Sequence, residues 1–227
     1  MRSFLFGVLS LAAASSTGAQ AGRLVDVGSF TVTLGGRTVG RESFRITATT
    51  LGDQSGFLVT SDITFGDRTI EPRLRTDATG AAVEYRVRVR PDGAEEMWEG
   101  GITRGRLIAS STGPGGTAAR EQVVARGTVV LDEDVIIHHW ALGLRPGDRR
   151  IPVLIPRRGN AQASWTVDVL GEERLRIGTE EVAARRLRAT DSAGVVREVW
   201  LDGAGRVLKV AIPSRALLAV RDDPPVG

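Results

Sequence analysis

Cysteine is absent from the 227 residues of the chain, and lysine and tyrosine each occur only once, at Lys209 and Tyr85. Without cysteine the protein has no disulfide, no thiol nucleophile and no thiolate ligand for a metal. The lipoprotein route, which acylates a Cys at the mature N-terminus, is excluded for the same reason. Stability must come from a hydrophobic core, and the chain is long enough to bury one.

An excess of one charge is also missing. The sequence contains 30 Lys and Arg against 27 Asp and Glu, a net charge of +3. The pI near 10.3 reflects how few groups titrate between the carboxylates and the guanidinium groups, not a strongly basic surface. Because arginines and acidic residues alternate instead of forming a basic stripe, the composition gives no support to nucleic-acid binding.

The first 21 residues predict a cleavable signal peptide. Arg2 precedes a short apolar run from Phe4 to Ala14, and small residues stand at Ala19 and Ala21, where signal peptidase requires them. The run is shorter than the roughly 20 residues of a membrane span. We therefore expect a periplasmic or secreted protein, cleaved after Ala21, with no transmembrane segment or lipid anchor after cleavage.

Apolar and polar residues alternate through most of the remaining chain, which is typical of half-buried β-strands. In residues 85–90, for example, Tyr, Val and Val alternate with three Arg, and a Pro-Asp-Gly turn follows at 91–93. Residues 22–227 are therefore predicted to form a single, mainly β domain. We expect a large antiparallel meander with a strongly curved sheet, as a half-barrel or a barrel-like sandwich.

One segment breaks the alternation and predicts a short helix near 132–143. It begins with three acidic residues, which suit a helix N-terminus, and it ends before Pro146. We expect this helix to lie between two β stretches, 22–131 and 148–222. Such a helix would cover an open end or the concave face of the sheet, because an apolar face must be shielded from water.

His138 and His139, the only histidines, fall within this predicted helix. Neighbouring helical residues point about 100° apart, and Asp134 with His138 would supply only two metal ligands, without an HExxH pattern. The sequence also has no Gly-x-Ser-x-Gly motif and no Gly-rich phosphate loop. We therefore expect no metal, no cofactor and no enzymatic activity, with the imidazoles placed at the helix C-terminus or capping carbonyl groups there.

Four tryptophans stand out in a chain with few aromatic residues, and they are Trp98, Trp140, Trp165 and Trp200. Two interpretations are open. The tryptophans pack in the core, which is the more frequent environment in a domain of this size, or they line a ligand cavity together with His138 and His139. In the second case Trp140 on the helix faces a cavity roofed by the sheet.

A series of turn and strand motifs runs through the C-terminal half, with LGLRPGD at 142–148, VDVLGEE at 167–173, REVWLD at 197–202 and GRVLKV at 205–210. Near the N-terminus, GRTVGRE at 36–42 is similar to a Gly-x-x-x-Gly-Glu hairpin with Arg41 added before Glu42. In this order the motifs resemble those of the secreted bacterial domain-of-unknown-function 3108 family and its relatives. The resemblance implies an envelope β domain with a strongly bent sheet, similar in architecture to lipoprotein carrier proteins, and it transfers no catalytic residue.

These observations favour a non-enzymatic envelope protein that binds an apolar or amphiphilic ligand, such as a lipid, on the concave face of its sheet. An alternative is a structural or interaction module of the cell envelope. In that case the protein binds an envelope protein partner through its sheet edges and through faces of alternating charge, such as Arg86, Arg88 and Arg90. A hydrolase that uses His138 or His139 is a third and weaker interpretation.

Overall fold

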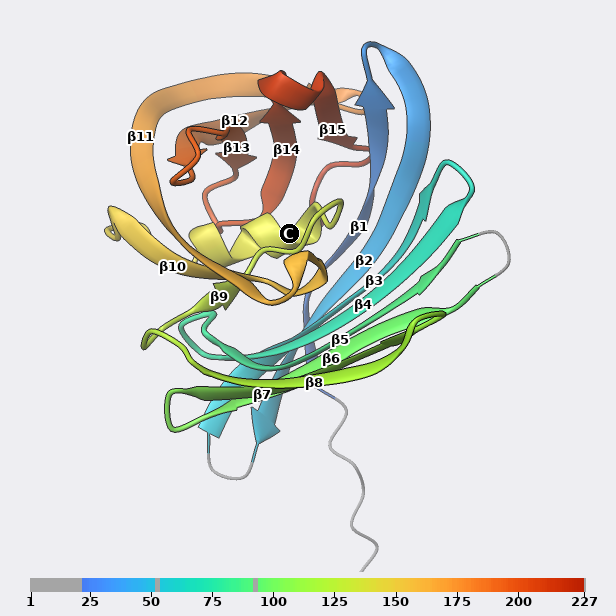
Figure 1. Ribbon diagram of the computed structural model, residues 1–227. Coiled ribbons are helices and arrows are strands. Elements are labelled where there is room, and N and C mark those ends of the chain that lie inside the picture. The colour runs from blue at the N-terminus through green and yellow to red at the C-terminus, as the bar shows by residue number, and fades with distance from the viewer. Residues whose placement is uncertain (1–21, 52–53, 92–93, 227) are drawn as a thin grey trace, which may run out of the picture.

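A computed structural model describes residues 22–51, 54–91 and 94–226, so the predicted signal peptide lies outside the described residues. Within these ranges the chain forms one large sheet of 15 strands and a few short helices (Figure 1). The predicted mainly β fold with a curved sheet and a short helix is confirmed. None of the helices in the described ranges has the length and apolar character needed to cross a membrane.

The strands fall into two groups, before and after the longest helix. The first group is β1 (Arg23–Leu34), β2 (Arg37–Leu51), β3 (Gln54–Phe65), β4 (Arg68–Asp77), β5 (Ala82–Arg90), β6 (Glu96–Thr103), β7 (Arg106–Gly113) and β8 (Gly116–Val123). The second group is β9 (Val129–Val130), β10 (Arg150–Ile155), β11 (Ala161–Ile177), β12 (Glu180–Thr190), β13 (Val196–Leu201), β14 (Val207–Ile212) and β15 (Leu217–Arg221). The helices of the described residues are 3₁₀-helices, η1 (Ile137–Leu142), η2 (Pro156–Arg158) and η3 (Pro213–Arg215).

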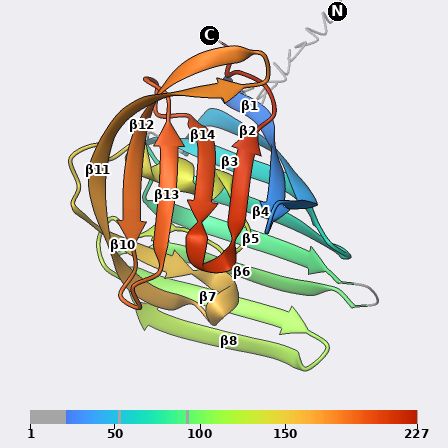
Figure 2. The ribbon, with the colours of Figure 1, turned by 90° about the horizontal axis from the view of Figure 1, so that it is seen from above.

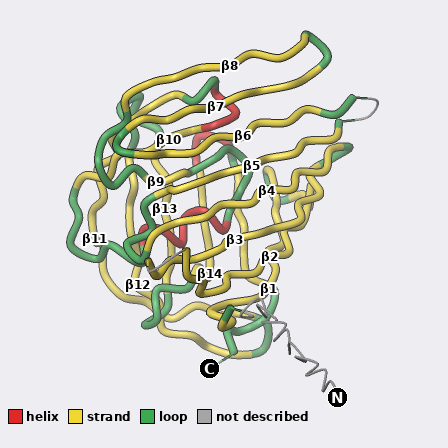
Figure 3. The backbone as a smooth tube through the Cα atoms, turned by 90° about the horizontal axis from the view of Figure 1, so that it is seen from below, coloured by secondary structure: helices red, strands yellow, loops and turns green. Residues whose placement is uncertain are grey.

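Strands that follow each other in the sequence pair with each other, except β8 and β9, which lie at the two ends of the sheet. At the centre of the sheet β1 pairs with the last strand, β15, with Phe30 opposite Arg221. All pairs are antiparallel apart from β9 and β10, which run parallel. Figure 3 shows β1 to β8 in their order, and Figure 2 shows β12 to β15 side by side.

The sheet curls round without closing. Its β9 end approaches β5, where the backbone N–H of Ala82 donates a hydrogen bond to the Thr128 carbonyl at 2.8 Å. Beyond that point β6 to β8 continue the sheet, and the β10–β11 turn contacts β8, because Gln122 Nε2 donates to the Asn160 carbonyl at 2.8 Å. The curved sheet is therefore a half-open barrel that wraps around an interior.

In strands such as β4 and β5 alternate residues point into this interior, as the alternating sequence predicts. Tyr85, Val87 and Val89 are buried in this way. Helix η1 also lies inside the curve (Figure 1), and all six of its residues are buried. Since η1 and the strand side chains fill the interior, the concave face of the sheet is a packed core.

Helix η1 differs from the predicted helix in its start and its type. The acidic residues 132–134 belong to the connection that follows β9, and the 3₁₀-helix begins at Ile137. The acids are held by arginines of the two other 3₁₀-helices, Asp132 by Arg157 of η2 at 2.8 Å and Asp134 by Arg215 of η3 at 2.6 Å. These ion pairs fix the acids outside the helix, which explains why their helix-starting pattern misplaced its N-terminus.

Both ends of η1 are anchored to the sheet. Glu42 on β2 is fully buried and accepts hydrogen bonds from the backbone N–H groups of Ile136 at 2.6 Å and Ile137 at 3.3 Å. At the other end, Gly143 packs so closely that a Cβ there would lie 2.4 Å from the carbonyl oxygen of Gly205. The helix position is therefore set by a hydrogen-bonded carboxyl at one end and by close backbone contact at the other.

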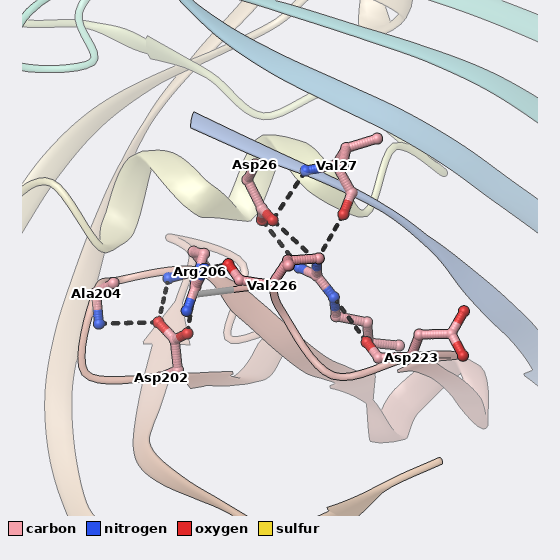
Figure 4. Close-up of polar contacts among 8 residues, drawn as sticks. Asp26, Val27, Asp202, Ala204, Arg206, Asp223 and Val226 are labelled. Atoms are coloured by element: carbon pink, nitrogen blue, oxygen red, sulfur yellow. Dashed lines mark hydrogen bonds and ion pairs between the residues drawn. The ribbon is translucent and has the colours of Figure 1, made fainter. Parts of the chain in front are cut away.

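A second buried ionic contact joins β1 to β15, and Figure 4 shows the polar contacts around its acidic partner, Asp26. Arg221 donates to both carboxylate oxygens of Asp26, at 2.9 and 2.8 Å, and to the carbonyl of Val27 at 2.8 Å. The side chains of Arg221 and Asp26 are 1% and 2% exposed. Removal of either partner would leave a buried charge unpaired, which is strongly unfavourable.

Candidate functional site

A pocket of about 190 Å³ lies where four strands of the second group end. Strands β9, β10, β12 and β14 run in the same direction, because they are parallel or two places apart in an antiparallel sheet. The connections that leave their carboxyl ends therefore come together at one end of the sheet. Apolar side chains of these segments form much of the pocket wall, among them Val135, Ile136, Ile155, Ile212 and Leu217.

The β12–β13 turn borders this pocket and has a local sequence signal. In Asp191-Ser-Ala-Gly194, the Asp191 carboxylate accepts hydrogen bonds from the backbone N–H groups of Ala193 and Val195, both at 2.9 Å. Gly194 has a φ of +80°, which favours glycine. The same carboxylate holds Arg197 at 3.1 Å, so the turn also positions an arginine at the pocket.

Charged side chains surround the pocket in pairs. The ion pairs between lining residues are Arg158–Glu133 at 3.4 Å, Arg197–Asp191 at 3.1 Å and Arg215–Asp134 at 2.6 Å. Asp132, the remaining acid of the lining, pairs with Arg157 at 2.8 Å. Every acid that lines the pocket is therefore neutralised by an arginine, and the site holds no unpaired negative charge.

Trp165 on β11 lines the pocket and is 1% exposed. The guanidinium carbon of Arg197 lies 4.1 Å from its ring centroid, a cation–π contact that fixes the indole. The ring N–H of Trp165 has no hydrogen-bond partner among the described residues. A buried donor left unsatisfied costs about 1–3 kcal/mol, and this nitrogen has essentially no exposed surface, so a molecule in the pocket does not touch it.

His139 on η1 lines the same pocket, and its ring centroid is 6.5 Å from that of Trp165. Its Nδ1 lies 3.0 Å from the carbonyl oxygen of Ile136. Since a carbonyl only accepts, Nδ1 must carry the proton. Burial lowers the pKa of His139 to about 4, so the ring is neutral at pH 7 and Nε2 is a bare acceptor. This buried Nε2 also lacks a partner within the part of the chain that the structure describes.

His138 has the opposite tautomer. The backbone N–H of Asp132 donates to its Nδ1 at 3.2 Å, so the proton of the neutral ring is on Nε2. Burial lowers its pKa to about 3. Both imidazoles bind the segment that precedes the helix, so neither caps a carbonyl group at the helix C-terminus, which was one of the two placements predicted; His139 does lie in the last turn of η1. The reason is the late start of the helix, which leaves residues 132–136 folded back beside the rings.

The other candidate residues lie away from the pocket. Trp140 is buried in the core, where its ring meets that of Phe57 edge-on at 4.8 Å between centroids. Trp98 on β6 is half-buried and packs against the same core. Of the six residues predicted from the sequence, His139 and Trp165 come together at the pocket, while His138, Trp98, Trp140 and Trp200 do not line it.

Trp200 belongs to a separate hydrophobic cluster with Ile177, Ala184 and Leu208. Its neighbours on β13, Val199 and Leu201, point into the interior, so the ring lies on the outer face of the sheet. There it packs between the charged ends of Arg186 and Lys209, 5.1 and 4.2 Å from its ring. Core packing therefore accounts for Trp140 and Trp200, and only Trp165 combines core packing with a place in a pocket.

The arginines of the pocket were not predicted as site residues. Arg158 ends η2 and Arg215 ends η3, whereas Arg197 follows the Asp-x-Ala-Gly turn, which was the one local signal. Their acidic partners come mainly from another segment, 133–134, and 81 positions separate Asp134 from Arg215. Only the folded sheet brings these charges together.

Comparisons of the chain with protein-family models, with curated proteins and with solved structures found no match. The resemblance to the domain-of-unknown-function 3108 family therefore stays a prediction from the motifs. In the described ranges no group of three or more His, Cys, Asp or Glu side chains is arranged to hold a metal ion.

Proposed function

We propose that the protein is a non-catalytic binding protein that holds a small, largely apolar molecule in the pocket at the ends of β9, β10, β12 and β14. The observation that carries the proposal is a pocket with an apolar wall, formed by Val135, Ile136, Ile155, Ile212 and Leu217 among others, and with paired charged groups at its border. Ligand sites combine apolar walls with a few polar groups that fix the orientation of the ligand. This pocket has both.

The size of the pocket limits the ligand. A cavity of about 150 Å³ holds one benzene molecule, so about 190 Å³ suits a single ring with a short substituent, or one end of a longer amphiphile. A whole lipid would have to enter the interior of the curve, which η1 fills. The ligand is therefore placed at the end of the curved sheet instead of along its concave face.

The setting of this binding is part of the proposal. The apolar run at residues 4–14 and the small residues at 19 and 21 support export to the periplasm or the outside of the cell. A soluble binding protein in that compartment would carry or retain a small molecule outside the cytoplasm.

Two matched variants test the proposal. Ala193→Trp places a large side chain at the pocket. The control, Ala204→Trp, makes the same change in the second Asp-x-Ala-Gly turn, at 202–205. The two turns are equivalent, because in each the aspartate accepts a 2.9 Å hydrogen bond from the backbone N–H of the alanine. Uncharged single-ring compounds are screened by saturation-transfer NMR and titrated by calorimetry. We expect binding that Ala193→Trp weakens at least tenfold and Ala204→Trp leaves unchanged. Absence of binding, or equal binding by the two variants, would contradict the proposal.

A second candidate function, an interaction module with an acidic protein partner, is favoured by one observation. On the outer face, Arg73 lies directly opposite Arg86, and like charges in this position are unfavourable. A shallow hollow of about 160 Å³ is lined by these two residues with Arg75 and Glu84. Arg86, Arg88 and Arg90, the arginines predicted from the sequence, are instead paired with glutamates.

The partner would therefore bind at Arg73 and Arg75. Crosslinking in cells tests this candidate, with the double charge reversal Arg73→Glu and Arg75→Glu compared with Arg106→Glu on β7. Loss of a crosslinked partner in the double variant alone would support it. A crosslinking pattern identical in all three proteins would rule it out.

A further inference from the structure

The open end of the sheet at β8 leads to an inference that does not depend on the pocket. We propose that β8 pairs in antiparallel fashion with β8 of a second copy of the chain, so that two half-open barrels share one continuous sheet. β8 is the outermost strand at its end of the sheet, and no described strand lies beyond it (Figure 2). Residues 116–121 of this strand are all exposed.

The two ends of the sheet are not equally protected. β9 has only two residues and lies against β5, where the Thr128 carbonyl accepts the hydrogen bond from Ala82. β8 has eight residues, contains neither proline nor lysine, and pairs with β7 in an unbroken register. Short strands, proline, lysine and bulges keep exposed edges from adding further strands. β8 has none of these features, so its edge is open to another strand.

The backbone groups at this free edge belong to the odd-numbered residues of β8. The backbone N–H of Val124 donates to the Gly105 carbonyl at 2.9 Å, one step beyond the Arg106–Val123 pair of the β7–β8 register. Opposite pairs in an antiparallel ladder alternate between hydrogen-bonded and non-hydrogen-bonded, so the even residues of β8 bond to β7. The Val123 carbonyl agrees with this assignment, because it accepts from Gln162 Nε2 at 2.8 Å, outside this strand pair.

Three residues therefore direct both their N–H and their C=O to the free edge, namely Thr117, Ala119 and Glu121. None of the backbone hydrogen bonds that lie outside the strand pairs, within the ranges that the structure describes, involves these residues. Three donors and three acceptors on alternate residues form the pattern to which an antiparallel strand binds. The edge is therefore suited to a strand and not to a single side chain.

The edge is complementary to itself in one register. When Ala119 lies opposite its own counterpart, Thr117 lies opposite Glu121, and the three donors and three acceptors of each chain all pair. Ala118 then lies opposite Arg120, so no two like charges face each other directly.

Other registers are less favourable. A shift of one strand by two residues in one direction places the two Arg120 side chains opposite each other, and a shift by four does the same with the two Glu121 side chains. A shift by two residues in the other direction places Glu121 opposite the turn at 114–115, where its backbone groups stay unpaired. The charges thus favour one pairing of β8 with a second copy.

Single cysteines test this register directly, because the chain has no cysteine of its own. Opposite residues of a hydrogen-bonded pair have Cα atoms about 5.5 Å apart, within the span of a disulfide. Under mild oxidation we expect Ala119→Cys to form a linked dimer at least about tenfold faster than Thr117→Cys, whose two copies would lie about 13 Å apart along the strand. A mixture of Thr117→Cys and Glu121→Cys should crosslink faster than either protein alone.

Sedimentation velocity of the purified protein measures the association without a crosslink. One strand pair forms a small interface, typical of transient association, so the average mass should rise toward two chains as the concentration approaches about 1 mM. Ala119→Glu should weaken association at least about tenfold, because it places like charges opposite each other. The matched control, Ala183→Glu, adds the same charge at an exposed position of β12 and should leave the dissociation constant unchanged.

Three results would overturn the proposal. Equal crosslinking at positions 117 and 119 would show that the strands meet without a register, whatever the mass. Association that Ala119→Glu does not weaken would place the contact elsewhere on the molecule. A photo-crosslinker at position 119 that captures a different protein in cells, while the purified chain stays monomeric, would assign the edge to a foreign strand. None of these results bears on the pocket, so the proposed binding function is tested separately.

Discussion

Glu42 gives the most direct test of how η1 is held in the interior. Its carboxyl is fully buried, and burial raises its pKa from 4.5 to about 7, although the hydrogen bonds from Ile136 and Ile137 act in the opposite direction. Between pH 4.5 and 7 the folded protein therefore binds a proton that the unfolded chain has lost. The stability that this proton contributes is fully present below pH 4.5 and is lost as the pH rises through 7.

The Glu42→Gln variant removes this pH dependence. Its amide is uncharged at every pH and can still accept one of the two backbone hydrogen bonds, as the protonated acid does. A pKa difference between 4.5 and about 7 corresponds to on the order of 3 kcal/mol, at about 1.4 kcal/mol for each pH unit. Relative to the unmodified protein, we expect the variant to gain about this much stability between pH 4.5 and pH 8.

Urea unfolding at several pH values measures this difference directly. Subtraction of the two free energies of unfolding cancels the effects of all other titrating groups, and Glu180→Gln, at an exposed position, controls for the loss of one negative charge. A difference that does not change with pH would refute the reasoning. A variant that becomes less stable above pH 7 would refute it more strongly, because the two backbone hydrogen bonds would then outweigh the cost of burying the charge.

Three further predictions concern other buried contacts, and urea unfolding tests each of them. Burial lowers the pKa of His139 from 6.5 to about 4, so the free energy of unfolding should fall by on the order of 3 kcal/mol as the pH falls from 6.5 to 4. His139→Phe should remove this part of the acid sensitivity. Equal acid sensitivity of the two proteins would contradict the prediction. Arg221→Met leaves Asp26 buried without its partner and should destabilise the protein by about 3–5 kcal/mol. Adding Asp26→Leu to this variant should restore much of the lost stability. If it restores none, an unpaired charge is not the cause of the loss. Gly143→Ala places a methyl group against the Gly205 carbonyl and should cost about 1–3 kcal/mol, and an unchanged midpoint would show that this end of η1 can shift.

The strands could be predicted from the sequence because their signal is local. In 85–90 the alternation alone separates buried Tyr85, Val87 and Val89 from the arginines between them. The position of the helix in the chain was predicted for the same reason. The residue at which the helix starts was not predicted, because the carboxylate of Asp132 binds Arg157, which follows it by 25 positions. A pattern of neighbouring residues does not indicate a contact between residues so far apart in the sequence.

The candidate site could be predicted only in part. His139 and Trp165 were candidates because of their residue types, but that these two line one pocket depends on η1 entering the interior beside β11. The tautomer of His139 depends on a single carbonyl, that of Ile136. Glu42 looked like part of a hairpin motif, and nothing near it in the sequence indicates that it binds the start of a helix 94 positions later.

The pairing of β1 with β15 has a consequence for how the protein folds. Five residue pairs join the two halves of the sheet there, and the Asp26–Arg221 contact beside them spans 195 positions of the chain. Until residues 217–221 are in place, β1 and β14 are unpaired edges at which other chains can add strands. Contacts so distant in sequence form slowly. The centre of the sheet therefore cannot form before the chain has been made as far as residue 221.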